Sequence, residues 1–211
     1  MRVGILGGTG EAGRGVGLRL AMAGHEVRLG SRSTERAVEA VAELTHDNLS
    51  GGDNRDAASF GDVVVVAVPW ESAHGTAAEV ENELASRIVL SMVNAVVFID
   101  GEPEPIVPPS GSVALGLQAQ LTRSHVVAAL HHVPAKLLAR RRTALDFDVL
   151  TCGDNRAALD QVMGLLDSID GLRAIDAGPL VNAAALETLT PVLIGLNLRY
   201  RSRTGLKIRG I

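Results

Sequence analysis

The sequence contains few of the residues on which several common chemistries depend. Its 211 residues include one cysteine, Cys152, which excludes an intramolecular disulfide and a cysteine-rich zinc or iron–sulfur site. Aromatic residues make up 2% of the chain, which disfavours base stacking on an aromatic platform. The net charge of −4 lacks the cationic excess that general nucleic-acid binding requires. We therefore expect neither a nucleic-acid partner nor a metal centre.

Long hydrophobic runs are also missing. The longest strongly apolar run covers residues 63–68, far fewer than the roughly 20 residues that cross a bilayer. At the N-terminus, residues 3–6 are the only apolar stretch before the glycines, unlike the pattern of a secretory signal peptide. Together with the single cysteine, these observations favour a cytoplasmic protein without a membrane partner.

What is present is an alternation of short apolar runs and helix-like segments. Strands are expected at residues 2–6, 26–29, 63–68, 88–90, 126–130 and 148–151, and helices at 11–23, 34–44, 72–85, 112–121, 157–169 and 180–200. Residues 91–110 contain four prolines and are expected to form a loop. The alternation predicts an α/β fold of the Rossmann type. It would have a doubly wound, mostly parallel sheet and a small C-terminal α/β extension ending in a long helix.

A glycine-rich turn follows the first expected strand. It fits the pattern G-x-G-x-x-G and comprises Gly8, Thr9, Gly10, Glu11, Ala12 and Gly13. In dinucleotide-binding proteins the first glycine permits the tight turn, the second admits a pyrophosphate, and the third lets the helix pack on the strand. The free N–H groups and the helix dipole stabilise the anion. The position between a strand and a helix favours a dinucleotide site over a turn without a ligand.

The end of the second expected strand favours NADP over NAD. NAD sites usually place an acidic residue there, to bind the ribose 2′-hydroxyl. This sequence instead has Ser31 and Arg32, with Arg36 four residues further on. Guanidinium groups and a hydroxyl suit a 2′-phosphate, so NADP is favoured. The less favoured alternative is that both arginines are solvated charges at a helix start. We expect an NADP-binding Rossmann domain over residues 1–130 and a C-terminal extension over residues 131–211.

Several short motifs together resemble one family over nearly the whole chain. They are the glycine turn, Gly30-Ser31-Arg32, Val68-Pro69-Trp70-Glu71, Leu130-His131-His132-Val133-Pro134-Ala135, Asp176-Ala177-Gly178-Pro179-Leu180 and Thr190-Pro191. In this order and spacing they are similar to the NADPH-dependent reductases of coenzyme F420. The resemblance implies a homodimer whose small-molecule partners are NADP and coenzyme F420, an 8-hydroxy-5-deazaflavin. It also implies reversible hydride transfer between these two cofactors.

The resemblance also assigns residues. The implied NADP contacts are Thr9, Ser31, Arg32 and Arg36, and the implied rim of the dinucleotide site is formed by Val68, Pro69 and Trp70. His131 and Pro134 fall in the region of the two reacting rings. His131 and His132 also end a strand expected to be buried, where an imidazole can hydrogen-bond a ring carbonyl. A purely structural role for each histidine is the alternative.

Two basic clusters remain after these assignments. One is the C-terminal tail with Arg199, Arg201, Arg203, Lys207 and Arg209, and the other comprises Lys136, Arg140, Arg141 and Arg142. The family's coenzyme carries a phosphate and a glutamate tail, so either cluster can attract it by charge. Solvated helix faces and a dimer contact are the alternative interpretation.

Two other functions fit the same N-terminal half. One is an NADPH-dependent reductase of a small imine or carbonyl compound, and the other is a non-catalytic NADP-sensing module. Imine and ketone reductases of this kind usually add a long helical dimerisation domain, for which little chain remains after residue 130. The single tyrosine, Tyr200, has no lysine at helical spacing, which argues against a short-chain carbonyl reductase. Hydride transfer between two cofactor rings requires no acid–base pair from the protein.

Overall fold

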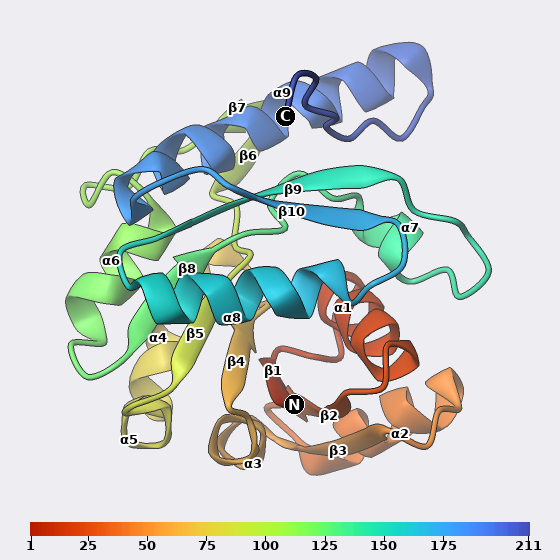
Figure 1. Cartoon of the computed structure of the whole chain (residues 1–211), viewed down its shortest axis with the longest axis vertical. Coiled ribbons are helices and arrows are strands. Elements are labelled where there is room, and N and C mark those ends of the chain that lie inside the picture. Colours follow the sequence, from red (N-terminus) through yellow and green to blue (C-terminus); the bar gives the residue numbers. More distant parts are fainter.

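The computed structural model describes residues 1–211, with one eight-stranded sheet at its centre (Figure 1). In spatial order its strands are β10 (Leu172–Asp176), β9 (Phe147–Gly153), β8 (His125–Ala128), β5 (Ile88–Ser91), β4 (Val63–Val66), β1 (Arg2–Leu6), β2 (Glu26–Ser31) and β3 (Leu49–Asp53). Every neighbouring pair is parallel except β8 and β9. The expected mostly parallel, doubly wound sheet is confirmed.

Helices cover both faces of the sheet because its central strands are apolar at successive positions. In β4, Val63 and Val65 belong to one core layer, and Val64 and Val66 to the other. The first layer packs under α1 (Glu11–Met22), α2 (Thr34–Leu44), α7 (Ala135–Leu138) and α8 (Arg156–Asp167). The second layer packs under α3 (Asn54–Phe60), α4 (Trp70–Glu79), α5 (Glu81–Leu84), α6 (Val113–Gln120), the 3-10 turn η1 (Leu180–Asn182) and the start of α9 (Ala183–Tyr200).

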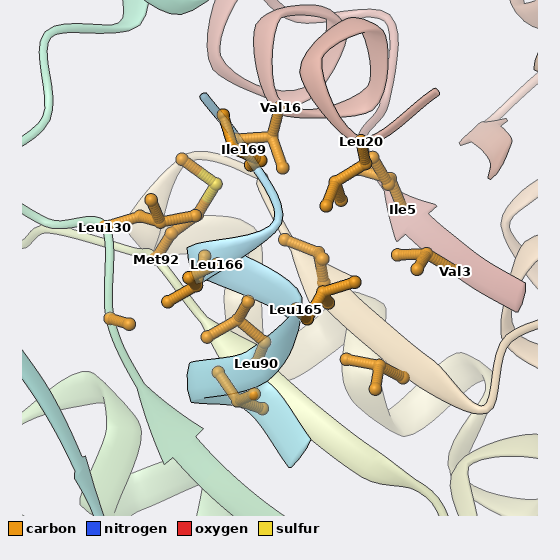
Figure 2. Close-up of a cluster of buried hydrophobic side chains, with 14 of the residues drawn as sticks. Val3, Ile5, Val16, Leu20, Leu90, Met92, Leu130, Leu165, Leu166 and Ile169 are labelled. Carbon is orange, nitrogen blue, oxygen red and sulfur yellow. The ribbon is translucent and has the colours of Figure 1, made fainter. Parts of the chain in front are cut away.

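Figure 2 shows the first layer, where two helices meet over the sheet. Leu20 of α1 and Leu165 of α8 lie in the same cluster as Val3 and Ile5 of β1. Leu130, just beyond β8, belongs to this cluster as well. Helix α8, from the C-terminal extension, is therefore built into the same core as the first βα unit.

The segment at residues 91–110 is not the plain loop that its prolines predict. It contains a hairpin of β6 (Val96–Ile99) and β7 (Glu102–Pro105). Asp100 and Gly101, both with positive φ, form the two-residue turn, and Asp-Gly is a favoured pair there. Proline in the second strand argues against a sheet interior, but it is tolerated on an isolated edge strand. The prediction was wrong because the proline signal outweighed the turn signal.

Other differences are smaller and concern short elements. The helix expected at residues 72–85 is interrupted at Val80, so α4 and α5 are separate. Sequence patterns also missed β3, α3, α7 and β10. Strand β3 was not predicted because it contains Gly51 and Gly52, and glycine is unfavourable in strands. A Cβ atom at Gly51 would lie 2.7 Å from the Ala37 backbone carbon, so α2 packs too closely for a larger residue.

The C-terminal part of the chain completes the sheet and adds a long crossing helix. β9 joins β8, and α9 lies across the β6–β7 hairpin (Figure 1). Glu187 of α9 is buried, and its carboxylate accepts hydrogen bonds from the backbone N–H groups of Val113 and Ala114, at 2.9 and 3.1 Å. Burial raises the pKa of Glu187, while these two bonds oppose the rise. The contact fastens α9 to the N-terminus of α6.

The segment Leu180–Tyr200 is long and apolar enough to cross a bilayer by length and composition alone. Within the fold, 44% of its most apolar window is buried against the rest of the protein. The core helix of a globular domain meets the same two criteria, so the pattern alone assigns no membrane role.

Candidate active site

A first cleft of about 470 Å³ follows the carboxyl ends of β2, β1 and β4. From β1 the chain moves outward to β2 and β3, and it later returns to place β4 on the other side. Ligands of doubly wound sheets bind at this reversal. The cleft is lined by Gly7, Thr9, Gly10, Ser31, Arg32, Arg36, Asn54, Ala67, Val68, Pro69, Ser72, Gly75, Thr76 and Glu79.

The glycines of the turn differ in how much space a side chain would find: one has room for a Cβ atom, and the others do not. A Cβ atom at Gly13 would lie 2.8 Å from the Gly7 carbonyl oxygen, so this glycine is required for close packing. At Gly10, which is exposed and starts α1, the nearest atom to such a Cβ would be 3.5 Å away. The absence of a side chain at Gly10 is therefore not required by packing of the protein, and it leaves free space in the first cleft. That space, at a helix N-terminus, fits a pyrophosphate.

Asn54 positions the glycine turn and was not identified from the sequence. Its side-chain oxygen accepts a hydrogen bond from the Gly7 backbone N–H at 3.2 Å. Asn54 is the first residue of α3, whose capping box is formed by Asp53 and Asp56. The pair Asp53-Asn54 after a short strand was the available signal, and it was lost because β3 itself went unrecognised.

Arg32 and Arg36 lie together with Ser31 at the end of the cleft beside β2. Both arginines are exposed, and neither guanidinium forms an ion pair or a hydrogen bond within the chain. Ser33 caps α2 by accepting a hydrogen bond from the Arg36 backbone N–H at 3.4 Å. The cap fixes the start of the helix that carries Arg36. The two unpaired guanidinium groups are suited to a dianionic phosphate.

The segment after β4 contributes unequally to this cleft. Val68 and Pro69 line it, as do Ser72 and Thr76 from α4. Trp70 begins α4 and is half-buried, and it packs against the second core layer rather than lining the cleft. Gly8 and Gly13 are buried beneath the turn, so their part is structural.

A second cleft of about 220 Å³ lies further along the same edge, at the ends of β5 and β8. Half of its lining is hydrophobic. It is lined by Ala12, Met92, Asn94, Leu130, His131, His132, Val133, Pro134, Ala135, Thr190, Leu193, Ile194, Asn197 and Thr204. Ala12 stands two residues after Gly10, so the first turn of α1 borders both clefts.

His131 is the polar group of this second cleft that lacks partners. It is buried, and neither of its ring nitrogens has a hydrogen-bond partner within the protein. Burial, assisted by the neighbouring His132, lowers the pKa of His131 to about 3. The imidazole is therefore neutral at physiological pH and offers one donor and one acceptor. A buried ring that lines a cleft with both nitrogens unpartnered is available to hydrogen-bond a bound molecule.

His132 is held more firmly. Its Nε2 atom lies 3.0 Å from the Asp148 carbonyl oxygen and 3.3 Å from the Leu150 backbone nitrogen. We assign the Nε2 proton to the shorter contact, so the ring donates to Asp148, and Nδ1 is unpartnered. Burial lowers the pKa of His132, so it too is neutral. Of the two histidines, His131 is the one without an anchor.

The backbone before these histidines is strained. Leu130 has φ of +68°, a left-handed conformation that side chains other than glycine rarely adopt. The expected strand at residues 126–130 accordingly ends at Ala128. This turn redirects the chain and places His131 and Pro134 in the second cleft. Strain of about 1–2 kcal/mol is typical of residues held for function.

A polar cluster holds the His131 backbone from α9. The Thr190 hydroxyl lies 2.9 Å from the His131 carbonyl oxygen and 2.8 Å from Asn94 Oδ1. The Asn94 amide donates to the same carbonyl at 3.1 Å. Three distant segments thus meet at one oxygen atom. The sequence did not single out Asn94, whose signal is a polar residue just after an apolar strand.

The sheet topology, the glycine turn and the cleft at the strand ends are those of a dinucleotide-binding protein of the Rossmann class. Residues 2–95 match the family model described as "NADP oxidoreductase coenzyme F420-dependent". An F420-dependent NADP reductase of Methanocaldococcus jannaschii is 38% identical over 100% of this chain and 99% of its own length. The chain belongs to the F420-dependent NADP reductase family.

Solved structures agree in fold. A crystal structure from Arthrobacter sp. FB24, provisionally assigned as an F420-dependent NADP reductase, has a TM-score of 0.87 and 27% identity, with all of both chains covered. An imine reductase of Streptomyces aurantiacus has a TM-score of 0.65 and 17% identity. That likeness covers 95% of this chain but 64% of the imine reductase, and at this identity it shows the fold alone.

Proposed function

We propose that this chain catalyses reversible, direct hydride transfer between NADP(H) in the first cleft and coenzyme F420 in the second. The observation that carries the proposal is that one helix turn, from Gly10 to Ala12, borders both clefts. The first cleft is polar and positively charged at one end, and the second is half apolar. Two cofactors bound in them meet at that turn.

The residues of the first cleft fit NADP. The N–H groups at the start of α1 face the pyrophosphate, and Gly10 leaves room for it. Thr9, Ser31, Arg32 and Arg36 bind the 2′-phosphate in this proposal, because they lie in the cleft and both guanidinium groups are unpaired. Val68 and Pro69 form the opposite wall. Trp70 supports that wall from the core.

The second cleft suits a flat aromatic ring with polar edges. His131 stays neutral, and its unpartnered nitrogens are satisfied by hydrogen bonds to a ring carbonyl or amide. Pro134 and Ala12 contribute apolar walls. The cofactors supply the redox chemistry: a hydride passes from nicotinamide C4 to deazaflavin C5, and N1 of the deazaflavin takes up a proton. The protein orients the rings and excludes water.

The direct test is a mixed-cofactor assay. The protein is given oxidised F420 with NADPH or with NADH, and the deazaflavin absorbance is followed. We expect rapid bleaching with NADPH and little with NADH, because only NADPH carries the phosphate that Arg32 and Arg36 face. Binding of NADPH without bleaching would contradict the proposal. It would point instead to an imine or carbonyl substrate, or to an NADP sensor.

We also infer that the protein forms a homodimer through α9. Val192, Leu198 and Tyr200 of α9 and Phe98 and Ile99 of β6 are exposed large hydrophobic residues. α9 packs on the hairpin that carries β6, so these side chains belong to one unit of the fold. Sedimentation of a Val192→Asp variant tests this: a monomer supports the inference, and an unchanged dimer contradicts it. The cytoplasmic location expected from the sequence stays a prediction.

A further inference from the structure

Residues 201–211, here called the C-terminal strap, are fastened to a buried carboxylate. Asp148 of β9 is fully buried, and its two oxygens accept hydrogen bonds from Arg173 at 2.9 and 2.7 Å. The same carboxylate accepts a bond from the backbone N–H of Ile208 at 2.6 Å. Arg173 in turn donates to the carbonyl oxygens of Ile208 and Ile211, at 3.0 and 2.9 Å. Asp148 therefore holds the far end of the strap.

The near end of the strap forms part of the second cleft. Thr204 lines this cleft, and its backbone N–H donates to Asn197 Oδ1 at 2.6 Å. Gly205 lies against the Phe147 ring, since a Cβ atom there would be 2.1 Å from a ring carbon. The strap is thus fixed between α9 and β9, with residues 201–203 directly before the cleft wall.

The basic residues of this region are not equivalent. Lys207 pairs with Asp146 at 2.5 Å, and Arg199 pairs with Glu102 at 3.2 Å. Arg201 and Arg203 are exposed, and their guanidinium groups form no ion pair or hydrogen bond within the chain. Arg209, at the far end of the strap, is unpaired as well. Arg201 and Arg203 are the unpaired arginines that stand within three residues of Thr204, which lines the second cleft.

The other basic cluster is placed differently. Arg141 donates to the carbonyl oxygens of Leu44 and Thr45, at 2.5 and 3.0 Å, so it is directed toward the end of α2. Lys136 follows Ala135, which lines the second cleft, and is the member of that cluster closest in sequence to the cleft. Arg140 and Arg142 of that cluster are also exposed and unpaired, but neither adjoins a residue that lines the cleft, whereas Arg203 directly precedes Thr204.

We propose that Arg201 and Arg203 bind the acidic tail of the deazaflavin coenzyme, its phosphate and glutamate groups, as the tail leaves the second cleft. The inference rests on the proposed function. Arginine is well suited to this role because its planar guanidinium pairs with both phosphate and carboxylate. In this proposal the second cleft binds the deazaflavin ring. The arginines of the strap then favour a coenzyme with an acidic tail over one without such a tail.

The test compares F420 with the same deazaflavin riboside lacking phosphate and glutamate. For the double variant Arg201→Glu/Arg203→Glu, we expect the KM of F420 to rise by about tenfold. The KM of the tailless compound and the Kd of NADPH should stay unchanged. The F420 selectivity of the wild type should also fall as salt is added. Parallel changes in both KM values, or no change in either, would overturn the proposal.

Three further variants keep the result interpretable. Arg209→Glu makes the same charge change on the strap away from the cleft wall and should leave both KM values within about twofold. Arg201→Lys/Arg203→Lys keeps the charge and should recover most of the lost affinity. A loss specific to F420 in Lys136→Glu, with none in the strap double variant, would overturn the assignment. Turnover of the tailless compound by the wild type separately reports whether the proposed function holds.

Discussion

The two clefts are built from the chain in opposite ways. The nucleotide cleft takes its centre from one continuous stretch, the end of β1 and the turn into α1, and it uses backbone groups. The second cleft collects residues from α1, the segments that follow β5 and β8, the start of α7, α9 and the strap, over residues 12 to 204. A backbone cradle leaves a local sequence signature, whereas a cleft assembled from distant side chains leaves almost none.

The two clefts should also differ in how they respond to amino-acid substitutions. In the first cleft the exposed groups are flexible arginines over a rigid glycine turn. In the second, a strained Leu130, a neutral His131 and Thr190 are buried. A half-buried Asn94 shares hydrogen bonds with Thr190 and the His131 carbonyl. We therefore expect substitutions in the first cleft to alter nucleotide binding alone. Substitutions in the second should alter both stability and the use of the deazaflavin.

Gly10→Ala should produce the largest effect, confined to the nucleotide cleft. Gly10 has φ of −72° and ψ of 162°, which alanine adopts readily, and the added Cβ has no close neighbour. It would, however, occupy the space proposed for the pyrophosphate, so the Kd of NADPH should rise by about 100-fold. Isothermal titration and the melting temperature check this together.

Gly164→Ala is the matched control for that substitution. Gly164 lies within α8, and a Cβ atom there would meet nothing within 4 Å. The protein should become more stable by about 0.5–1 kcal/mol because alanine favours helix, with NADPH affinity unchanged. If Gly10→Ala bound NADPH as tightly as Gly164→Ala does, the assignment of the pyrophosphate position would be wrong.

Arg32→Glu should change which nucleotide is preferred. The substitution removes a partner of the 2′-phosphate and installs the carboxylate that binds a ribose hydroxyl. We expect the Kd of NADPH to rise by about 30-fold and the affinity for NADH to hold or improve. Measurement of both Kd values decides the point, since equal losses for the two nucleotides would mean that Arg32 does not face the phosphate.

His131→Gln should change the acid stability of the protein. The folded-state pKa of about 3 lies below the ordinary value of 6.5, so the unfolded chain binds a proton that the folded protein excludes. The contribution of neutral His131 to the free energy of unfolding is therefore complete above pH 6.5, and it decreases as the pH falls from 6.5 toward 3. The wild type should lose up to about 1.4 kcal/mol per pH unit more than the variant in this window.

Urea unfolding between pH 7 and pH 4 measures this difference. His132 and Asp148, whose pKa values are also lowered, remain in both proteins, so the difference between the two proteins reports on His131 and its coupling to His132. Parallel pH dependences for the wild type and the variant would show that His131 is solvated rather than buried.

Thr190→Val should have the smallest effect. It removes the hydroxyl that lies between Asn94 and the His131 carbonyl while keeping the shape of the side chain. The loss of one hydrogen bond, about 1 kcal/mol, should lower kcat/KM for F420 by about fivefold and leave the Kd of NADPH unchanged. Thr188→Val is the control, because that hydroxyl donates to Ala184 within α9 at 2.8 Å. Equal effects of the two substitutions would exclude a role for Thr190 in positioning His131.

The sequence predicted those parts of the fold where one local pattern decides the structure. The four-valine strand β4 and the capped helix α2 were found because burial on both faces and helical periodicity are visible in few residues. The strand β3 was missed because it contains Gly51 and Gly52, which are poor strand formers. Both glycines are needed because α2 and α3 pack closely against the strand, and this tertiary constraint is not visible in the local sequence.

The same limit applies to the sites. The glycine turn and Arg32 follow from strand-to-helix patterns. His131 follows from its place at the end of an expected buried strand and from a family resemblance, and Pro134 from that resemblance alone. Asn54 could not be found in this way, because it acts through a contact with Gly7, which is far away in the sequence. Thr204 could not be found either, because the strap that carries it is held by Asp148, a residue of a distant strand. Thr204 lines the second cleft through this tertiary arrangement, which no local pattern predicts.

The central claim is that a hydride passes directly between the two clefts, and isotope transfer tests it most directly. NADPH carrying deuterium at the transferable C4 position is mixed with oxidised F420 and the protein in ordinary water. The reduced coenzyme is then examined by mass spectrometry. Direct transfer predicts one deuterium at C5 of the deazaflavin in each product molecule. Reduced F420 without deuterium, its hydrogen drawn from water, would contradict the account.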